Sequence, residues 1–262
     1  MSETVLLEVE GGVARITLNR PERLNAFAGT MRDDLHDAID RAAGSPEVRV
    51  LVLTGAGRGF CTGADVEVMS DLLHRGDDRT FAGLVEAGKR VVRRLGSVEQ
   101  PVVAAVNGPA AGAGAALALA CDFRIASERA SIGFTFNRIG LHPDWGATHT
   151  LPRLVGPGRA AELVMSGRMV DAREAERIGL FERVVAAESF EAEVRTLAAE
   201  LAAKPPLALR LAKRTLAESA SSSLDATLAA EGERQMRCFR SADAREGIAA
   251  FNEKRQAVFT GE

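Results

Sequence analysis

The stretch VVAAVNGPAAGAGAALALACD, residues 102–122, decides the fold class of this chain. Five apolar residues predict a buried strand, a turn rich in glycine and alanine follows, and an uncharged run then has the composition of a buried helix. The stretch LVLTGAGRGFCTGADVEVM, residues 51–69, shows the same order of features. Turns of this kind expose backbone N–H groups at the start of a helix, where they suit an anion or an oxygen that becomes negative during a reaction.

Strand-like and helical patterns alternate on both sides of these two turns. The strand-like runs are 4–10, 13–19, 49–55, 101–108 and 122–127. The helical patterns among them are 27–43, 65–75, 79–95 and 112–120. Strands that alternate with helices predict an α/β core. After residue 156 the strand signal nearly vanishes, so we expect a core over residues 1–200 and a helical region over 201–262 with amphipathic helices.

Composition argues against several classes of function. The 262 residues carry a net charge of −3, which gives no basic surface for nucleic acid. The uncharged stretch 101–121 is interrupted by Asn107, Pro109 and glycines, so a membrane span is not expected. Acidic residues in MSETVLLEVEGG argue against a targeting segment. Three widely spaced cysteines predict a reducing, cytoplasmic location with neither a disulfide framework nor a metal site.

One acidic residue, Asp144, lies in the segment GLHPDWGATHTLPRLVG, residues 140–156. Glycines and apolar residues surround it, and a carboxylate that loses water is costly and has a raised pKa. Such a group is a candidate general acid or base. Because Pro143 followed by Asp144 also favours a turn, the residues alone leave a purely structural role open.

Five motifs, in this order and at these spacings, carry a resemblance to a known family. They are ITLNRPERLNAF (16–27), FCTGADV (60–66), VNGPAAGAGAALALACDFRIAS (106–127), IGLHPDWGATHTLPRLVG (139–156) and SADAREGIAAFNEKR (241–255). Through them nearly the whole chain resembles the enoyl-CoA hydratase/isomerase (crotonase) superfamily. The resemblance implies a spiral of β-β-α units, followed by C-terminal helices that assemble homotrimers, often stacked as hexamers. It also implies an acyl-CoA substrate, with no cofactor apart from the CoA of that substrate.

The resemblance further assigns roles to residues of this sequence. It implies an oxyanion hole made by the backbone N–H groups of Ala64 and Ala113, two donors that would stabilise an enolate oxygen where its charge develops. Contacts to CoA are implied for Arg23, for the backbone of Ala64, Asp65 and Val66, and for Lys254 of a neighbouring subunit. Phe136, His142 and Trp145 are candidates for the acyl pocket, with plain core packing as the alternative for each.

Two glutamates that the family's hydratases use are absent here. The corresponding positions hold Ala116 and Phe136, neither of which can deprotonate water or donate a proton. Asp144 remains, and it matches the aspartate that is the acid/base of the family's phenylacetate-pathway isomerases. One carboxyl group suffices to move a double bond, because it can take a proton from one carbon and return it to another. Three alternatives stay open: a hydratase in which Asp144 directs water, nucleophilic attack of Asp144 on an aryl-CoA, and a weakly catalytic CoA-binding or RNA-binding relative.

Overall fold

A computed structural model of the protein describes residues 3–262 and contains two sheets. In the six-stranded sheet the order is β1-β2-β3-β4-β6-β9. Its strands are β1 (Val5–Glu10), β2 (Val13–Leu18), β3 (Val50–Gly55), β4 (Val102–Val106), β6 (Phe123–Ser127) and β9 (Arg183–Val185). The first two form an antiparallel hairpin, and each later strand pairs in parallel with its neighbour. The expected α/β core is therefore present.

A second, three-stranded sheet has the order β5-β7-β8, with β5 (Ala110–Ala111), β7 (Ser131–Gly133) and β8 (Met169–Asp171). The expectation that strands nearly end at residue 156 is wrong, because β8 and β9 both lie beyond it. Each has only three residues, too few to show an alternation of apolar and polar positions. They are strands because earlier strands offer them partners: β7 pairs with β8, and β6 pairs with β9.

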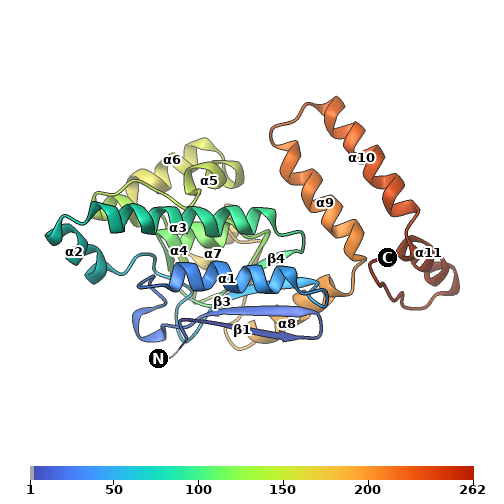
Figure 1. The fold of residues 1–262 in the computed structure, drawn as a ribbon, viewed down its shortest axis with the longest axis horizontal. Coiled ribbons are helices and arrows are strands. Elements are labelled where there is room, and N and C mark those ends of the chain that lie inside the picture. The colour runs from blue at the N-terminus through green and yellow to red at the C-terminus, as the bar shows by residue number, and fades with distance from the viewer. Residues whose placement is uncertain (1–2) are drawn as a thin grey trace.

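Helices cover both faces of the larger sheet (Figure 1). The helices of the core are α1 (Met31–Gly44), α2 (Val66–Arg75), α3 (Asp78–Ser97), α4 (Ala113–Leu119), α5 (Ala147–Val155), α6 (Pro157–Ser166), α7 (Ala172–Arg177) and α8 (Phe190–Ala202). Leu51 and Leu53 of β3 pack into the main core with α1, α3 and α4, whereas Val50 and Val52 pack against α8. A strand buried on both faces reads as a continuous apolar run, as this one does.

The first helix begins at residue 31, and the expected start at 27 is wrong. Phe27 instead forms an isolated parallel bridge with Ala64, in which the Phe27 N–H donates to the Gly63 carbonyl at 2.7 Å. A long-range backbone contact thus takes the residue out of the helix that its local sequence favours. This bridge also holds the turn after β3 in place.

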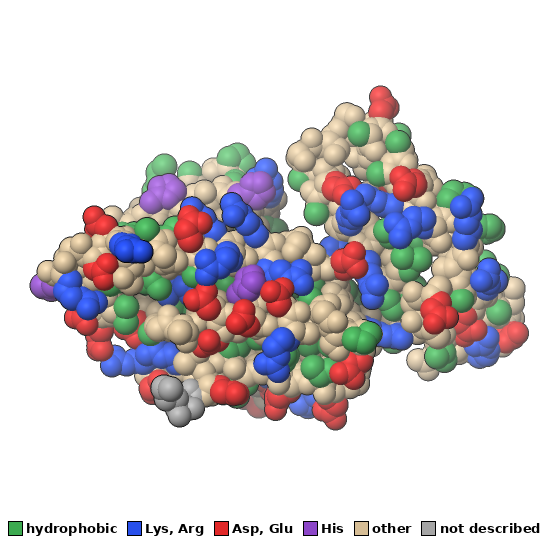
Figure 2. Space-filling view, viewed as in Figure 1, with side chains coloured by type: hydrophobic (Ala, Val, Ile, Leu, Met, Phe, Trp, Pro, Cys, Tyr) green, Lys and Arg blue, Asp and Glu red, His purple; other side chains and the backbone are tan. Residues whose placement is uncertain are grey.

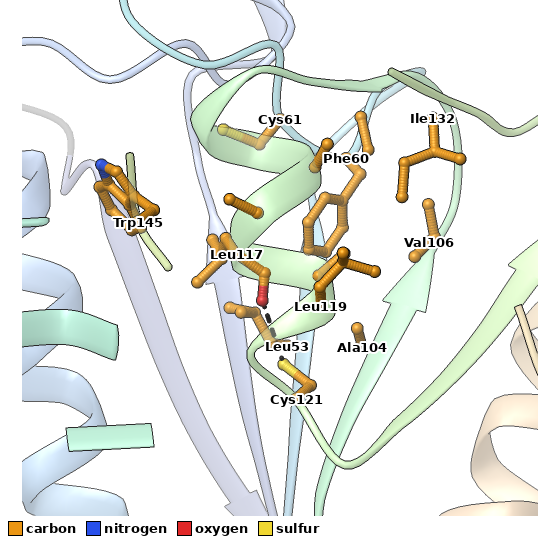
Figure 3. Close-up of a cluster of buried hydrophobic side chains, with 14 of the residues drawn as sticks. Leu53, Phe60, Cys61, Ala104, Val106, Leu117, Leu119, Cys121, Ile132 and Trp145 are labelled. Carbon is orange, nitrogen blue, oxygen red and sulfur yellow. Dashed lines mark hydrogen bonds between the residues drawn. The ribbon is translucent and has the colours of Figure 1, made fainter. Parts of the chain in front are cut away.

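The short helix α4 lies in the centre of the main core, and all seven of its residues are buried. Figure 3 shows it among apolar side chains of other elements, including Leu53, Phe60, Val106 and Ile132. A Cβ added to Gly114 would lie 1.9 Å from the Cys61 carbonyl oxygen, so only glycine permits this close approach of the helix to the first turn. The two glycine turns noted in the sequence are therefore packed directly on each other.

The last three helices, α9 (Pro206–Ser219), α10 (Leu224–Phe239) and α11 (Ala242–Glu253), form an arm that extends away from the core (Figure 1). In the space-filling view a hollow separates this arm from the α5–α6 end of the core (Figure 2). Large apolar side chains are exposed along the arm: Leu216, Leu224, Leu228, Phe239, Ile248 and Phe251. The division of the chain at residue 200 stays a prediction. Within residues 3–262, each helix is too short or too polar to cross a membrane.

Candidate active site

A cavity of about 740 Å³ lies where the two glycine turns meet α2, α3 and the segment that contains Asp144. Seven of the residues singled out in the sequence line it: Ala64, Val66, Ala113, Phe136, His142, Asp144 and Trp145. Except for Thr62, Thr135 and a few charged groups, the side chains around it are mainly apolar. The fold therefore brings the predicted donors, the predicted carboxyl group and the predicted acyl-pocket residues to one place.

The backbone N–H groups of Ala64 and Ala113 are both without a hydrogen-bond acceptor within residues 3–262. At Ala64 this follows from the bridge to Phe27, which uses the Gly63 carbonyl and the Asp65 N–H and leaves the amide between them free. Ala113 is the first residue of α4, and the first N–H groups of a helix have no acceptor within it. Two free donors at one cavity wall match the geometry required of an oxyanion hole.

Two glycines bring these donors close together. Gly63 has a φ of 89°, and a Cβ there would lie 3.2 Å from the Ala113 nitrogen. Gly112, directly before Ala113, combines a φ of 53° with a ψ of −121°, a conformation that side-chain-bearing residues avoid. The sequence therefore needs glycine at both positions to place the two alanine amides side by side.

The structure shows Asp144 in a turn and also in the lining of the cavity. Its carbonyl accepts a hydrogen bond of 3.1 Å from the Ala147 N–H, which closes a turn. Its half-buried carboxyl group lines the cavity, and the buried Oδ1 has no hydrogen-bond partner among the described residues. Loss of water raises the pKa of Asp144 above its ordinary value, and this effect outweighs the opposing influence of the charges on Arg32 and His142.

Trp145 fixes the position of its neighbour Asp144. Its φ of 51° is rare for a bulky residue, so the turn is held by packing. The indole stacks on Phe27 with ring centroids 4.7 Å apart and an angle of 25° between the planes. The indole also meets Gly88 of α3. Trp145 is 4% exposed, so it contributes to the core as well as to the cavity wall.

Arg32 is among the residues of this cavity that the sequence analysis did not predict. It is 5% exposed, lines the cavity, and its guanidinium carbon lies 5.1 Å from the centre of the Phe27 ring. The acidic residues around it in MRDDLHDAIDR favour a solvent-exposed helix start, so the local sequence does not predict that Arg32 is buried. The signal was nevertheless present, because Arg32, Leu35 and Ile39 follow the spacing of one buried helix face.

Three predicted substrate contacts lie outside the residues that line the cavity. The Arg23 side chain forms two hydrogen bonds to Glu67, at 2.8 and 2.9 Å. The Asp65 carboxylate caps α2 by accepting from the Glu67 N–H and also pairs with Arg20 at 3.1 Å. Lys254 ends α11 with a φ of 54° and is exposed. Their roles toward CoA stay predictions, and for Lys254 the contact was expected in a neighbouring subunit.

The two positions of the absent glutamates differ in their surroundings. Phe136 lines the cavity and belongs to the 3₁₀ helix η2 (Thr135–Ile139). Ala116 is 1% exposed within α4 and does not line it. Asp144 is the one carboxyl group among the cavity-lining residues of the described chain.

Comparison with known proteins places the chain among acyl-CoA enzymes. Residues 8–262 match the family model described as enoyl-CoA hydratase/isomerase. The chain is 38% identical over 258 residues to the crotonyl-CoA hydratase of Syntrophomonas wolfei subsp. wolfei. This match covers 98% of each chain. It is 41% identical over 268 residues to the 1,2-epoxyphenylacetyl-CoA isomerase of Escherichia coli K12, covering 100% of each.

Among solved structures, the chain is similar to an enoyl-CoA hydratase from Bacillus anthracis. The TM-score is 0.94 and the identity 34%, over 99% of this chain and 100% of the other. This likeness confirms the expected crotonase-like fold with its helical C-terminal region. The two relatives compared by sequence differ in the reaction that their names describe.

Proposed function

The chain belongs to the enoyl-CoA hydratase/isomerase family, and within this family we propose that it is an acyl-CoA isomerase that moves a double bond by means of one carboxyl group. Among the described residues, Asp144 supplies the single carboxyl group of a cavity that also contains the unpaired amides of Ala64 and Ala113, and this observation carries the proposal. Adding water to a double bond needs groups that hold and deprotonate water while a proton reaches carbon. Moving a double bond needs one group that transfers a proton.

In the proposed reaction the thioester oxygen accepts hydrogen bonds from the Ala64 and Ala113 amides. The Asp144 carboxylate removes a proton from one carbon of the acyl chain, and the electron pair of that C–H bond delocalises onto the thioester oxygen as a dienolate. The two N–H groups stabilise the negative oxygen without reorganising. The Asp144 carboxyl group then returns the proton to a different carbon, which restores the thioester carbonyl with the double bond in a new position.

The environment of Asp144 supports this role. A raised pKa makes the carboxylate a stronger base and brings its conjugate acid closer to the working pH, so that both halves of the transfer are served. The apolar walls formed by Val66, Phe136 and Trp145 limit the access of water to the dienolate. A second cavity of about 260 Å³ shares Val66, Phe81 and Leu141 with the first and extends the apolar surface beneath α2.

The second candidate is a hydratase in which Asp144 directs a water molecule. The name of the S. wolfei relative favours it, and the unpartnered Oδ1 of Asp144 could accept a hydrogen bond from water. The test incubates the protein with 3-hexenoyl-CoA and, separately, with crotonyl-CoA, and follows product mass and the position of unsaturation. Conversion of 3-hexenoyl-CoA to its 2-enoyl isomer without gain of mass supports the proposal. If crotonyl-CoA gains 18 mass units faster than 3-hexenoyl-CoA isomerises, the protein is a hydratase and the isomerase proposal is wrong. A ring-bearing 3-enoyl-CoA in the same panel tests a role in phenylacetate breakdown.

We further propose a homotrimer or a hexamer formed through the C-terminal arm. Exposed apolar side chains along α10 and α11 support it, as does an apolar cavity of about 410 Å³ lined by Phe123, Leu209 and Leu216 between α9 and the core. In such an assembly Lys254 of a neighbour would bind the phosphates of CoA, together with Arg23 and the backbone around Asp65.

The proposed reaction uses no cofactor. The three free cysteines, two of them buried, support a reducing, cytoplasmic location.

A further inference from the structure

The guanidinium of Arg32 is a charged donor without an acceptor. Its Nε and Nη1 are buried and make no hydrogen bond within residues 3–262. Within the same part of the chain, no carboxylate oxygen lies within 4.0 Å of the group, so it is not ion-paired. Leaving the N–H groups of a charged side chain buried and unpaired costs stability. No hydrogen bond among the described residues offsets this cost.

Packing holds the Arg32 side chain in this position. The guanidinium stacks on the Phe27 ring, and Phe27 stacks in turn on Trp145, the neighbour of Asp144. Arg32 and Asp144 line the same cavity, and each influences the pKa of the other. Nε and Nη1 are closed off from the cavity, so the guanidinium meets the space of the proposed proton transfer through its third nitrogen, Nη2, which also has no hydrogen-bond partner among the described residues.

The geometry points to a polar subsite for the acyl group: we propose that Arg32 donates a hydrogen bond to a neutral oxygen on the acyl chain, so that the preferred substrates are oxygen-bearing acyl-CoAs. This inference rests on the acyl-CoA function proposed above and narrows its substrate class. An unsubstituted hydrocarbon chain would displace water from Nη2 without replacing its hydrogen bond. A hydroxyl, carbonyl or ring oxygen near the reacting carbons would accept from Nη2.

Charge favours a neutral oxygen over a carboxylate at this subsite. When Asp144 is ionised as the base, its charge balances that of Arg32, and Arg138, which also lines the cavity, is exposed to solvent. An acyl carboxylate would add a negative charge beside the place where the dienolate forms, and would oppose its formation. A neutral acceptor satisfies Arg32 without this repulsion.

The test measures binding with four unreactive acyl-CoAs, so that it does not depend on turnover. They are hexanoyl-CoA, its 3-oxa and 5-oxa analogues, in which an ether oxygen replaces a methylene, and adipoyl-CoA, which carries a distal carboxylate. Dissociation constants are determined by calorimetry for the wild type and for Arg32→Met, which keeps the apolar contact with Phe27. We expect at least one ether to bind the wild type about tenfold more tightly than hexanoyl-CoA, as for a hydrogen bond to a charged donor. In Arg32→Met this preference should vanish while hexanoyl-CoA binds at least as well.

Equal binding of ethers and hexanoyl-CoA to the wild type, or an ether preference that survives in Arg32→Met, overturns the inference. Tighter binding of adipoyl-CoA than of both ethers also overturns it, in favour of an anionic substrate. Should Arg32→Met fail to fold, Arg32→Lys replaces it: it keeps the charge without the planar fork, and we expect it to reduce the ether preference. Isomerisation of 3-hexenoyl-CoA is measured alongside. An intact ether preference without isomerisation removes the proposed function alone, and isomerisation without the preference removes this inference alone.

Discussion

Trp145 lies so close to Gly88 that a Cβ on this glycine would be 2.4 Å from the indole Nε1. The contact joins the middle of α3 to the residue that follows Asp144. Because the backbone of Trp145 is in the left-handed region, the turn has little intrinsic stability and depends on this contact and on the Phe27 stack. The position of the candidate catalytic carboxyl group is therefore set by a residue more than fifty positions earlier in the chain.

Gly88→Ala should displace Trp145 and with it Asp144. We expect a lower melting temperature and a loss of stability of about 1–3 kcal/mol, as for overpacking in a core, together with a fall in kcat. Gly83→Ala is the matched control on the same helix, since a Cβ there meets no atom within 4 Å. The control should leave activity unchanged and stabilise the helix by up to about 1 kcal/mol. Equal behaviour of the two variants in thermal unfolding and turnover would contradict the packing argument.

Asp144→Asn should abolish isomerisation while acyl-CoA still binds. The amide keeps the shape of the carboxyl group but cannot accept the proton, and we expect kcat to fall by at least about 10²–10⁴-fold. The loss should appear in kcat more than in KM, because the interaction matters in the transition state. Exchange of substrate α-protons with deuterated water, followed by mass spectrometry, should stop as well. Near-normal turnover would leave Asp144 as a turn residue only.

The same variant should alter the pH dependence of stability. Burial raises the pKa of Asp144 above its ordinary value of 3.8, so between the two pKa values the folded state binds more protons than the unfolded state. The free energy of unfolding of the wild type therefore falls as pH rises through this window, and stays lower above it. Asp144→Asn removes this term, and its melting temperature at neutral pH should exceed that of the wild type. A lower melting temperature at every pH would contradict this prediction.

Arg32→Met should shift the pH profile of activity. The Arg32 charge lowers the pKa of Asp144 and opposes the effect of burial, with a smaller contribution from His142. Without it the pKa of Asp144 rises, and the acid limb of kcat/KM, which reports the base form of the free enzyme, should move to higher pH. His142→Gln should shift the limb in the same direction by less. An unchanged limb in Arg32→Met would mean that Asp144 is not the group that titrates.

The assembly is expected to be a trimer or a hexamer in light scattering at micromolar concentration. Phe251 is 83% exposed on α11, and Phe239 is exposed at the end of α10. Aspartate at both positions should dissociate the assembly, because a charge replaces apolar surface that the subunits would bury. Leu73→Asp is the control, since Leu73 is similarly exposed but lies on α2, at the opposite end of the molecule from the arm (Figure 1). A monomeric wild type would contradict the proposed trimer or hexamer.

Much of this protein could be predicted from its residues because local chemistry decides those features. The apolar runs before the glycine turns predicted β3 and β4. Gly63 and Gly112 adopt backbone conformations that other residues avoid. The matched motifs placed Ala64, Ala113 and Asp144 on one list of candidates, and all three line one cavity. The three C-terminal helices lie within the helical region expected over residues 201–262 from its amphipathic patterns.

Only the tertiary structure decided the remaining features, and in each case the partner is distant in sequence. β8 and β9 are strands because β7 and β6 lie beside them, and Phe27 leaves the first helix because Ala64 offers a backbone bridge. Arg32 looks solvated among its acidic neighbours, yet stacking on Phe27 and closure of the cavity bury it. Burial and loss of water are properties of the folded chain as a whole, which is why the raised pKa of Asp144 and the unpaired donors of Arg32 become definite only when the chain is folded.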